Sequence, residues 1–173
     1  MLEALIFVVF PFCMVFAAVS DTLSMTIANR VPLLLLAVFA VVAPLTGMEW
    51  AAYGWHFAAG ALVLLFTFGL FAIGGMGGGD AKLLTATAVW MGFNIHLIEY
   101  LVTSAFFGGV LAVAILSYRG SVLATFTSRN MFLRNFADGR DGIPYGIALG
   151  IGGLVTYPGS PLMVWALERL AGQ

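Results

Sequence analysis

Two aspartates stand where apolar runs meet polar stretches, and their placement suggests hydrolytic chemistry. Asp21 follows the apolar run 2–20, and Asp80 precedes the run 81–93, 59 positions further along. Ionisable groups close to hydrocarbon are costly and tend to be functional. Two carboxylates held close share a proton, so that one acts as general base on water while the other polarises a peptide carbonyl. The alternative is two unrelated aspartates, one capping a helix and one facing headgroups.

The residues directly before Asp80 favour hydrolysis. Positions 74–79 are all glycine except Met76, and such a run breaks a helix, allows positive φ and lets a substrate backbone come close. Non-helical backbone near a membrane survives only when protein buries it or when it lines a wet cavity. The alternative is a flexible hairpin between two helices. A phosphate-binding loop is excluded, because the tract follows an apolar helix and Leu83, not Ser or Thr, follows Lys82.

The composition sets the elements that must position these residues. Of 173 residues, 62% are hydrophobic and only 9% are charged, whereas a soluble domain has about 25% charged residues. The chain is therefore predicted to be an integral membrane protein. A net charge of −1 without a basic stripe argues against nucleic-acid binding. A single cysteine, Cys13, cannot form an intrachain disulfide or a multi-cysteine metal site, and we expect no metal and no cofactor.

A helix needs about 20 mostly apolar residues to cross a bilayer. The sequence predicts an all-α fold with about six transmembrane helices, forming one polytopic domain over residues 1–173, with a glycine-rich loop between the third and fourth. The apolar runs cover residues 2–20, 31–48, 51–73, 81–93, 96–117 and 143–167, the last interrupted by Pro158 and Pro161. The first run lacks a basic segment before it and carries Glu3, so a retained span fits better than a cleaved signal peptide.

Charge asymmetry predicts the orientation. All basic residues except Arg169 fall in or beside the loops of one side: Arg30, Lys82, Arg119, Arg129, Arg134 and Arg140. The opposite loops hold Glu49 and Glu99 but no lysine or arginine. The positive-inside rule then puts the basic loops in the cytoplasm and both termini outside. Asp21 and Asp80 arrive at the same cytoplasmic boundary, where packing of the first and fourth helices must bring them together.

Three motifs carry a resemblance to a known family. Gly75-Met76-Gly77-Gly78-Gly79-Asp80-Ala81-Lys82 resembles the GxGD signature of intramembrane aspartic peptidases, in the version of type IV prepilin peptidases. Asp21 fits the family's other catalytic aspartate, and Ile27-Ala28-Asn29 resembles the I-x-N that follows it. Ile143-Pro144-Tyr145-Gly146 resembles an element most typical of the short peptidases that process Flp-type pilins. The resemblance covers essentially the whole chain.

The resemblance implies a catalytic pair, Asp21 and Asp80, and an active-site loop shaped by Gly75, Gly77, Gly78 and Gly79. It implies an aspartic endopeptidase of the bacterial inner membrane that removes the short basic leader of prepilins or pseudopilins at the cytoplasmic boundary, alongside pilus assembly machinery. Longer members also N-methylate the new terminus and carry a domain with paired cysteines. Because this chain has one cysteine, the resemblance implies peptidase activity alone.

Four further residues have two interpretations each. Lys82 either tunes Asp80 and orients the loop or anchors the helix at the cytoplasmic boundary. Asn29 either forms a hydrogen bond near the site or ends the first span. His56 and His96 fall toward the outer face, where interfacial anchoring is favoured over a metal site.

The segment 118–142 mixes apolar residues with arginines, which predicts an interfacial amphipathic helix or a substrate-docking flap. Asp138 and Asp141 within it predict a solvated turn. Two other function classes stay open: a small transporter or channel that uses the acidic pair as an ion site, and a non-catalytic scaffold subunit of a pilus or secretion machine. Transporter sites usually lie near the midplane of an internal repeat, and the sequence shows no convincing repeat.

Overall fold

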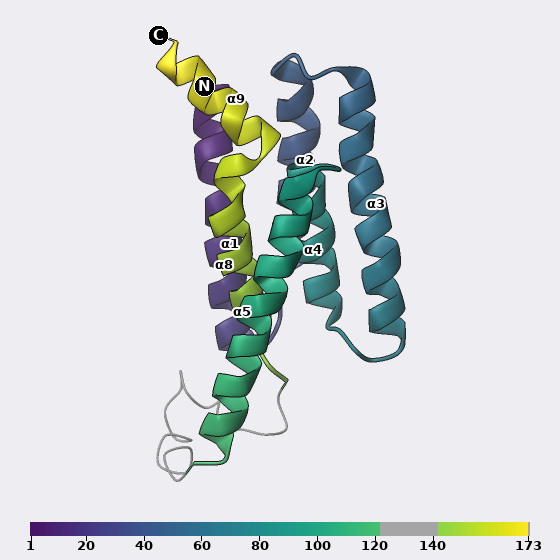
Figure 1. The fold of residues 1–173 in the computed structure, drawn as a ribbon, viewed down its shortest axis with the longest axis vertical. Coiled ribbons are helices and arrows are strands. Elements are labelled where there is room, and N and C mark those ends of the chain that lie inside the picture. Colours follow the sequence, from purple (N-terminus) through teal and green to yellow (C-terminus); the bar gives the residue numbers. More distant parts are fainter. Residues whose placement is uncertain (122–141, 173) are drawn as a thin grey trace.

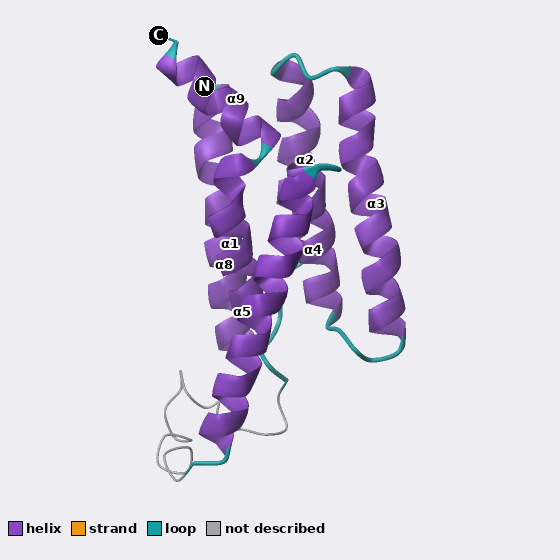
Figure 2. Cartoon of the chain, in the orientation of Figure 1, coloured by secondary structure: helices purple, strands orange, loops and turns teal. Residues whose placement is uncertain are grey.

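The computed structural model describes residues 1–121 and 142–172, in which all regular structure is helical (Figures 1 and 2). The helices are α1 (Leu2–Ser24), α2 (Arg30–Leu45), α3 (Trp50–Ala72), α4 (Gly78–Met91), α5 (Ile95–Arg119), α8 (Gly146–Thr156), the 3-10 turn η1 (Tyr157–Gly159) and α9 (Pro161–Ala171). The prediction of an all-α membrane fold is confirmed.

By helix length, fewer helices qualify as membrane spans than the six that the sequence predicts. Within the described residues, α1, α3 and α5 are long and apolar enough to cross a membrane, and α8 with α9 makes a fourth candidate if this bent pair is one span. The pair bends by 46° beside Pro158 and Pro161. α2 has 16 residues and α4 has 14, short of the roughly 20 that a straight span needs.

The helices run alternately up and down, so that both termini lie at one end of the bundle (Figure 1). The turn between α1 and α2 and the glycine-rich connection between α3 and α4 lie toward the opposite end (Figure 1). α3 packs mainly on α4, and α5 packs mainly on α8. α1 packs against α8 and α2, and α2 packs against α4.

α4 is the central helix of the bundle, and it runs from the glycine tract to Gly92, which ends it. It is buried over most of its length, and a helix that is apolar all round belongs in a core. Trp90 near its end has no exposed surface and donates a hydrogen bond to the Leu35 carbonyl at 2.9 Å. Its ring lies 5.3 Å from that of Phe10, which stacks on Tyr157 at 4.1 Å. This aromatic cluster ties α1, α2, α4 and η1 together away from Asp80.

Two helix boundaries near the aspartates differ from the prediction. α1 extends to Ser24 rather than residue 20, and Met25 ends it with φ 52°. Within the last turn, the hydroxyls of Thr22 and Ser24 donate to carbonyls four residues back, at 2.7 Å each. Asp21 therefore lies inside α1. α4 begins at Gly78, so the last two residues of the glycine tract, Gly78 and Gly79, are helical.

Candidate active site

Asp21 is held by the first peptide group of α8. Its side chain is buried, with 6% exposure, and its Oδ2 accepts a hydrogen bond from the Gly146 N–H at 2.7 Å. The first N–H groups of a helix have no partner within the helix, and the positive end of the helix dipole attracts a carboxylate. The start of α8 therefore fixes a carboxylate that is 125 positions away in the sequence.

Gly146 must be glycine for this contact to form. A Cβ added to Gly146 would lie 2.7 Å from Asp21 Cβ and 2.9 Å from Asp21 Oδ2, closer than real Cβ contacts. Sequence reasoning recognised the motif that ends in Gly146 but gave the residue no role. The signal was the motif itself, which places a glycine where a helix begins after Pro144.

Asp80 occupies the first turn of α4, two residues after its first residue, Gly78. Gly77 is the N-cap residue, and a Cβ added there would lie 2.9 Å from Asp80 Oδ2. Gly77 thus leaves the space that the Asp80 carboxylate fills. The side chain is partly buried and lines a cavity, and its position at a helix N-terminus is one where a carboxylate is stabilised.

The structure brings the two aspartates to the same end of the bundle, Asp21 in the last turns of α1 and Asp80 in the first turn of α4 (Figure 1). α1 and α4 meet through side chains further along, because Thr87 Oγ1 lies 4.0 Å from Met14 Sδ and Phe10 packs on Trp90. The sequence required the first and fourth helices to pack for such a pair, but in the described residues α1 and α4 touch through these side chains, whereas most of the packing of α1 is on α8 and α2. α8 contributes the third partner, through Gly146.

The Ile27-Ala28-Asn29 segment contacts the start of α4 at two points. The Asn29 Oδ1 accepts a hydrogen bond from Lys82 Nζ at 2.8 Å. A Cβ added to Gly79 would lie 3.2 Å from Ile27 Cβ, so Gly79 lets the turn after α1 approach α4. Asn29 thus forms a hydrogen bond near the site, as one of its two interpretations held, and its partner is Lys82, two residues after Asp80.

The glycine tract is only partly a loop, which corrects the prediction of an active-site loop over all four glycines. Gly75 and Gly77 lie in the connection, whereas Gly78 and Gly79 belong to α4. Within the tract, only Gly74 has a positive φ, of 74°. Gly78 lies against the Phe71 ring, with 3.3 Å from an added Cβ to Cε2.

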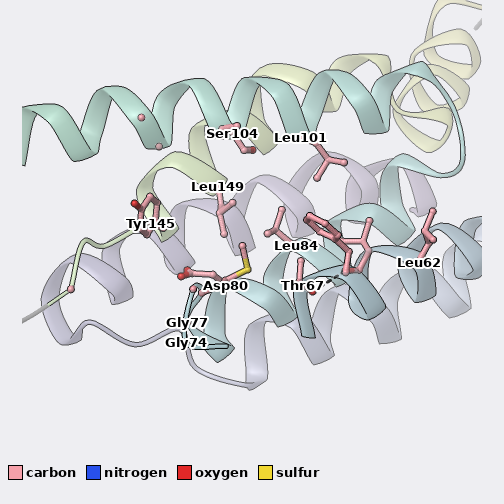
Figure 3. A pocket seen from close by; sticks show the side chains of 18 residues that line it. Leu62, Thr67, Gly74, Gly77, Asp80, Leu84, Leu101, Ser104, Tyr145 and Leu149 are labelled. Carbon is pink, nitrogen blue, oxygen red and sulfur yellow. Dashed lines mark hydrogen bonds between the residues drawn. The ribbon is translucent and has the colours of Figure 1, made fainter. Parts of the chain in front are cut away.

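A cavity of about 900 Å³ opens beside Asp80. Figure 3 shows Asp80, Gly74, Gly77 and Tyr145 at one end and Leu62 and Leu101 toward the other. We call it the α3/α5 cavity, because its walls come from α3 and α5, with α4 and α8 between them; it is lined by Leu62, Val63, Phe66, Thr67, Gly74, Gly75, Met76, Gly77, Asp80, Leu84, Leu101, Ser104, Ala105, Gly108, Gly109, Gly142, Tyr145 and Leu149.

The histidines lie away from both aspartates, but the expectation of interfacial anchoring was wrong for His56. Its side chain is buried, with Nδ1 2.7 Å from the Val89 carbonyl oxygen. A Cβ on Gly92 would lie 2.6 Å from its ring, so His56 is packed into the core. His96 is partly exposed and pairs with Glu99 at 2.9 Å. Cys13 is buried, and among the described residues no three His, Cys, Asp or Glu side chains cluster as metal ligands.

Most of the segment 118–142 lies outside the described residues, including Asp138, Asp141 and the arginines 129, 134 and 140. Its described ends are connected, since Arg119 donates a hydrogen bond to the Gly142 carbonyl at 2.9 Å. The predictions of an amphipathic helix and of a solvated turn stay predictions.

Fold and site together define a class: a multi-pass helical membrane protein with two carboxylates from different helices at one end of its bundle. The model of the type IV leader peptidase family matches residues 8–113, more than half of the chain, and the chain belongs to this family. It is therefore a bacterial membrane protease of a family whose substrates are type IV prepilins. The match includes Asp21 and Asp80 but ends before α8. Searches of curated proteins and of solved structures gave no match.

Proposed function

We propose that the chain is an intramembrane aspartic endopeptidase that uses Asp21 and Asp80 to remove the leader from Flp-type prepilins. The observation that carries the proposal is that these two aspartates, 59 positions apart, lie at the same end of the bundle, where Asp80 lines a cavity next to the glycine-rich connection and Asp21 is held by the start of α8. Neither carboxylate has a basic side chain as its hydrogen-bond partner within the described residues, so a shared proton serves both.

The chemistry requires only water and the two carboxylates. The ionised carboxylate takes a proton from a water molecule, whose oxygen bonds to the carbonyl carbon of the scissile peptide. The protonated carboxylate donates a hydrogen bond, then its proton, to the carbonyl oxygen. When the C–N bond breaks, the carboxyl group that took the water proton passes it to the leaving nitrogen, which becomes the new N-terminus of the pilin. The other carboxylate takes a proton from a hydroxyl of the tetrahedral intermediate as the C=O bond forms again. Both carboxylates then share one proton again.

The location of the pair supports cleavage at the membrane boundary. Asp21 and Asp80 share the end of the bundle to which Arg30, Lys82 and Arg119 belong, and the termini lie at the other end (Figure 1). With the positive-inside rule, this end faces the cytoplasm across the inner membrane. A prepilin that keeps its basic leader in the cytoplasm and its apolar helix in the bilayer presents its cleavage site at this depth.

Two features support the narrower assignment to Flp-type pilins without methylation. The Ile143-Pro144-Tyr145-Gly146 element, most typical of the peptidases for Flp-type pilins, supplies the N–H that holds Asp21. The chain has one cysteine, whereas the methylating members carry a domain with paired cysteines. We therefore expect a processed pilin with an unmethylated N-terminus.

The test is leader removal from a Flp-type prepilin, co-expressed with the chain in cells that lack their own prepilin peptidase. Asp21→Asn and Asp80→Asn keep the side-chain shape but cannot serve as general base, so each is expected to lower processing at least 100-fold. Glu99→Gln is the matched control, because this carboxylate lies near the start of α5, at the other end of the bundle, and it should process like wild type.

The outcomes are distinct when each variant is present in the membrane at equal amount. Processing that survives in either aspartate variant contradicts the catalytic pair. Failure of wild type with Flp-type prepilins, together with cleavage of pseudopilins, contradicts the substrate assignment. Mass spectrometry of the mature pilin detects methylation directly.

A further inference from the structure

The α3/α5 cavity has an apolar mouth between two helices. Leu62 and Phe66 of α3 and Leu101 of α5 line it and are 54%, 69% and 37% exposed. α3 packs mainly on α4 and α5 mainly on α8, which leaves the space between α3 and α5 to the cavity. Apolar side chains around an opening suit contact with hydrocarbon, so the cavity opens sideways into the bilayer.

The α5 wall is built from small residues, Ala105, Gly108 and Gly109. Gly108 has a reason inside the fold, because an added Cβ would lie 3.4 Å from the Tyr145 ring. Gly109 has none, since an added Cβ would meet no atom within 4 Å. Small residues on a membrane helix let the backbone of another helix come close, and no described helix takes that place against Gly109.

One polar side chain of α5 belongs to the same wall. Ser104 lines the cavity and is 5% exposed. Its Oγ is buried against Gly152 of α8, where a Cβ added to Gly152 would overlap it. In Figure 3, Ser104 and Leu101 face Leu84 and Thr67 across the cavity. The α5 wall therefore offers the cavity a surface of small and apolar groups.

We propose that the α3/α5 cavity binds the apolar helix of the substrate, which enters sideways from the bilayer and places its unwound N-terminal end at Asp80. The proposal rests on the proposed function. The cavity ends at Asp80, with Gly74, Gly77 and Tyr145 around it, where the scissile peptide must lie. From Gly109 to Leu101 the α5 wall extends about 12 Å at 1.5 Å per residue, enough for about two helical turns beyond the cleavage site.

The first test fills the cavity without disturbing the fold. Gly109→Leu enlarges a residue that lines the cavity and whose added Cβ meets no atom within 4 Å, so processing should fall at least 10-fold, through a higher KM. Gly69→Leu is the matched control, because an added Cβ there also meets no atom within 4 Å and Gly69 does not line the cavity. Its processing should stay within twofold of wild type. Equal processing by the two variants overturns the proposal.

The second test detects binding without cleavage. The chain with Gly109→Cys or Gly69→Cys is combined in membranes with a prepilin that carries one cysteine in the first two turns of its apolar helix, and both are oxidised. A disulfide at position 109 and none at 69 is expected, while the buried Cys13 is a constant background. Wild-type processing without a disulfide at 109 overturns the cavity assignment alone. Absence of wild-type processing overturns the proposed function and the cavity assignment with it.

Discussion

At the scale of single residues, glycines next to the aspartates matter as much as the carboxylates. Gly146 gives its N–H to Asp21, and Gly77 leaves room for Asp80. In both cases a side chain would occupy the space of a carboxylate oxygen. Because both contacts need a residue without a side chain, we infer that the positions of both carboxylates depend on glycine at these two places.

A single methyl group should test this. Gly146→Ala places a Cβ 2.7 Å from Asp21 Cβ, so Asp21 must move away from the α8 N-terminus, and we expect processing to fall at least 10-fold. The loss cannot come from helix formation, because alanine is the better helix former by about 1 kcal/mol. Leader removal and membrane abundance are measured together.

The control for that variant is Gly69→Ala, where an added Cβ meets no atom within 4 Å. It should leave processing unchanged. Full activity in Gly146→Ala would mean that Asp21 does not need the hydrogen bond from α8 for cleavage.

At the scale of elements, the turn between α1 and α2 is attached to the start of α4. Ile27 packs on Gly79, and Asn29 accepts a hydrogen bond from Lys82. Asp21 precedes this turn and Asp80 lies between Gly79 and Lys82. The two contacts therefore fix the elements that carry the two carboxylates relative to each other.

A double-mutant cycle on Asn29→Ala and Lys82→Ala, measured by thermal unfolding in detergent, tests this attachment. The pair is exposed, so we expect a coupling free energy of about 0.2–1 kcal/mol. The double variant should lose less stability than the sum of the losses in the two single variants.

A second cycle, on Asn29→Ala and Arg30→Ala, is the comparison, because Arg30 is an exposed cation next to Asn29 on the same turn. Its two effects should add. Additive effects in the Asn29 and Lys82 cycle would show that their hydrogen bond does not stabilise the turn.

At the scale of the whole molecule, the alternating helices place all described basic residues except Arg169 at one end. Glu49, before α3, lies at the end with the termini, and Gly120, after α5, lies at the opposite end (Figure 1). The proposed orientation puts Glu49 outside the inner membrane and Gly120 in the cytoplasm.

Cysteine labelling measures this orientation, because the native Cys13 is buried. In cells with a permeabilised outer membrane and an intact inner membrane, an impermeant maleimide should label Glu49→Cys. Gly120→Cys should react only after the inner membrane is opened. The reverse pattern contradicts the cytoplasmic site. Labelling of both positions while the inner membrane is intact would put them on the same side, which contradicts an odd number of membrane crossings between Glu49 and Gly120.

From the sequence alone, we could infer that the chain lies in a membrane, where its helices run, and which carboxylates are candidates for catalysis. Long apolar runs can satisfy their backbone in a bilayer only as helices, so their positions follow from hydropathy, and Asp21 and Asp80 stand out because charge is scarce. The helix ends near them were less well predicted: α1 continues to Ser24, past Asp21, and α4 begins at Gly78, within the glycine tract.

The surroundings of the carboxylates became known only from the tertiary structure, because they come from distant parts of the chain. The contacts of Asp21 with Gly146, of Asn29 with Lys82 and of His56 with Val89 join residues 125, 53 and 33 positions apart. The α3/α5 cavity likewise joins distant parts of the chain, because four helices contribute to its walls. In a membrane protein most helix faces are apolar, and lipid is as apolar as the helices, so hydropathy does not encode which faces pack together. That choice depends on small residues, side-chain fit and single hydrogen bonds across the bundle.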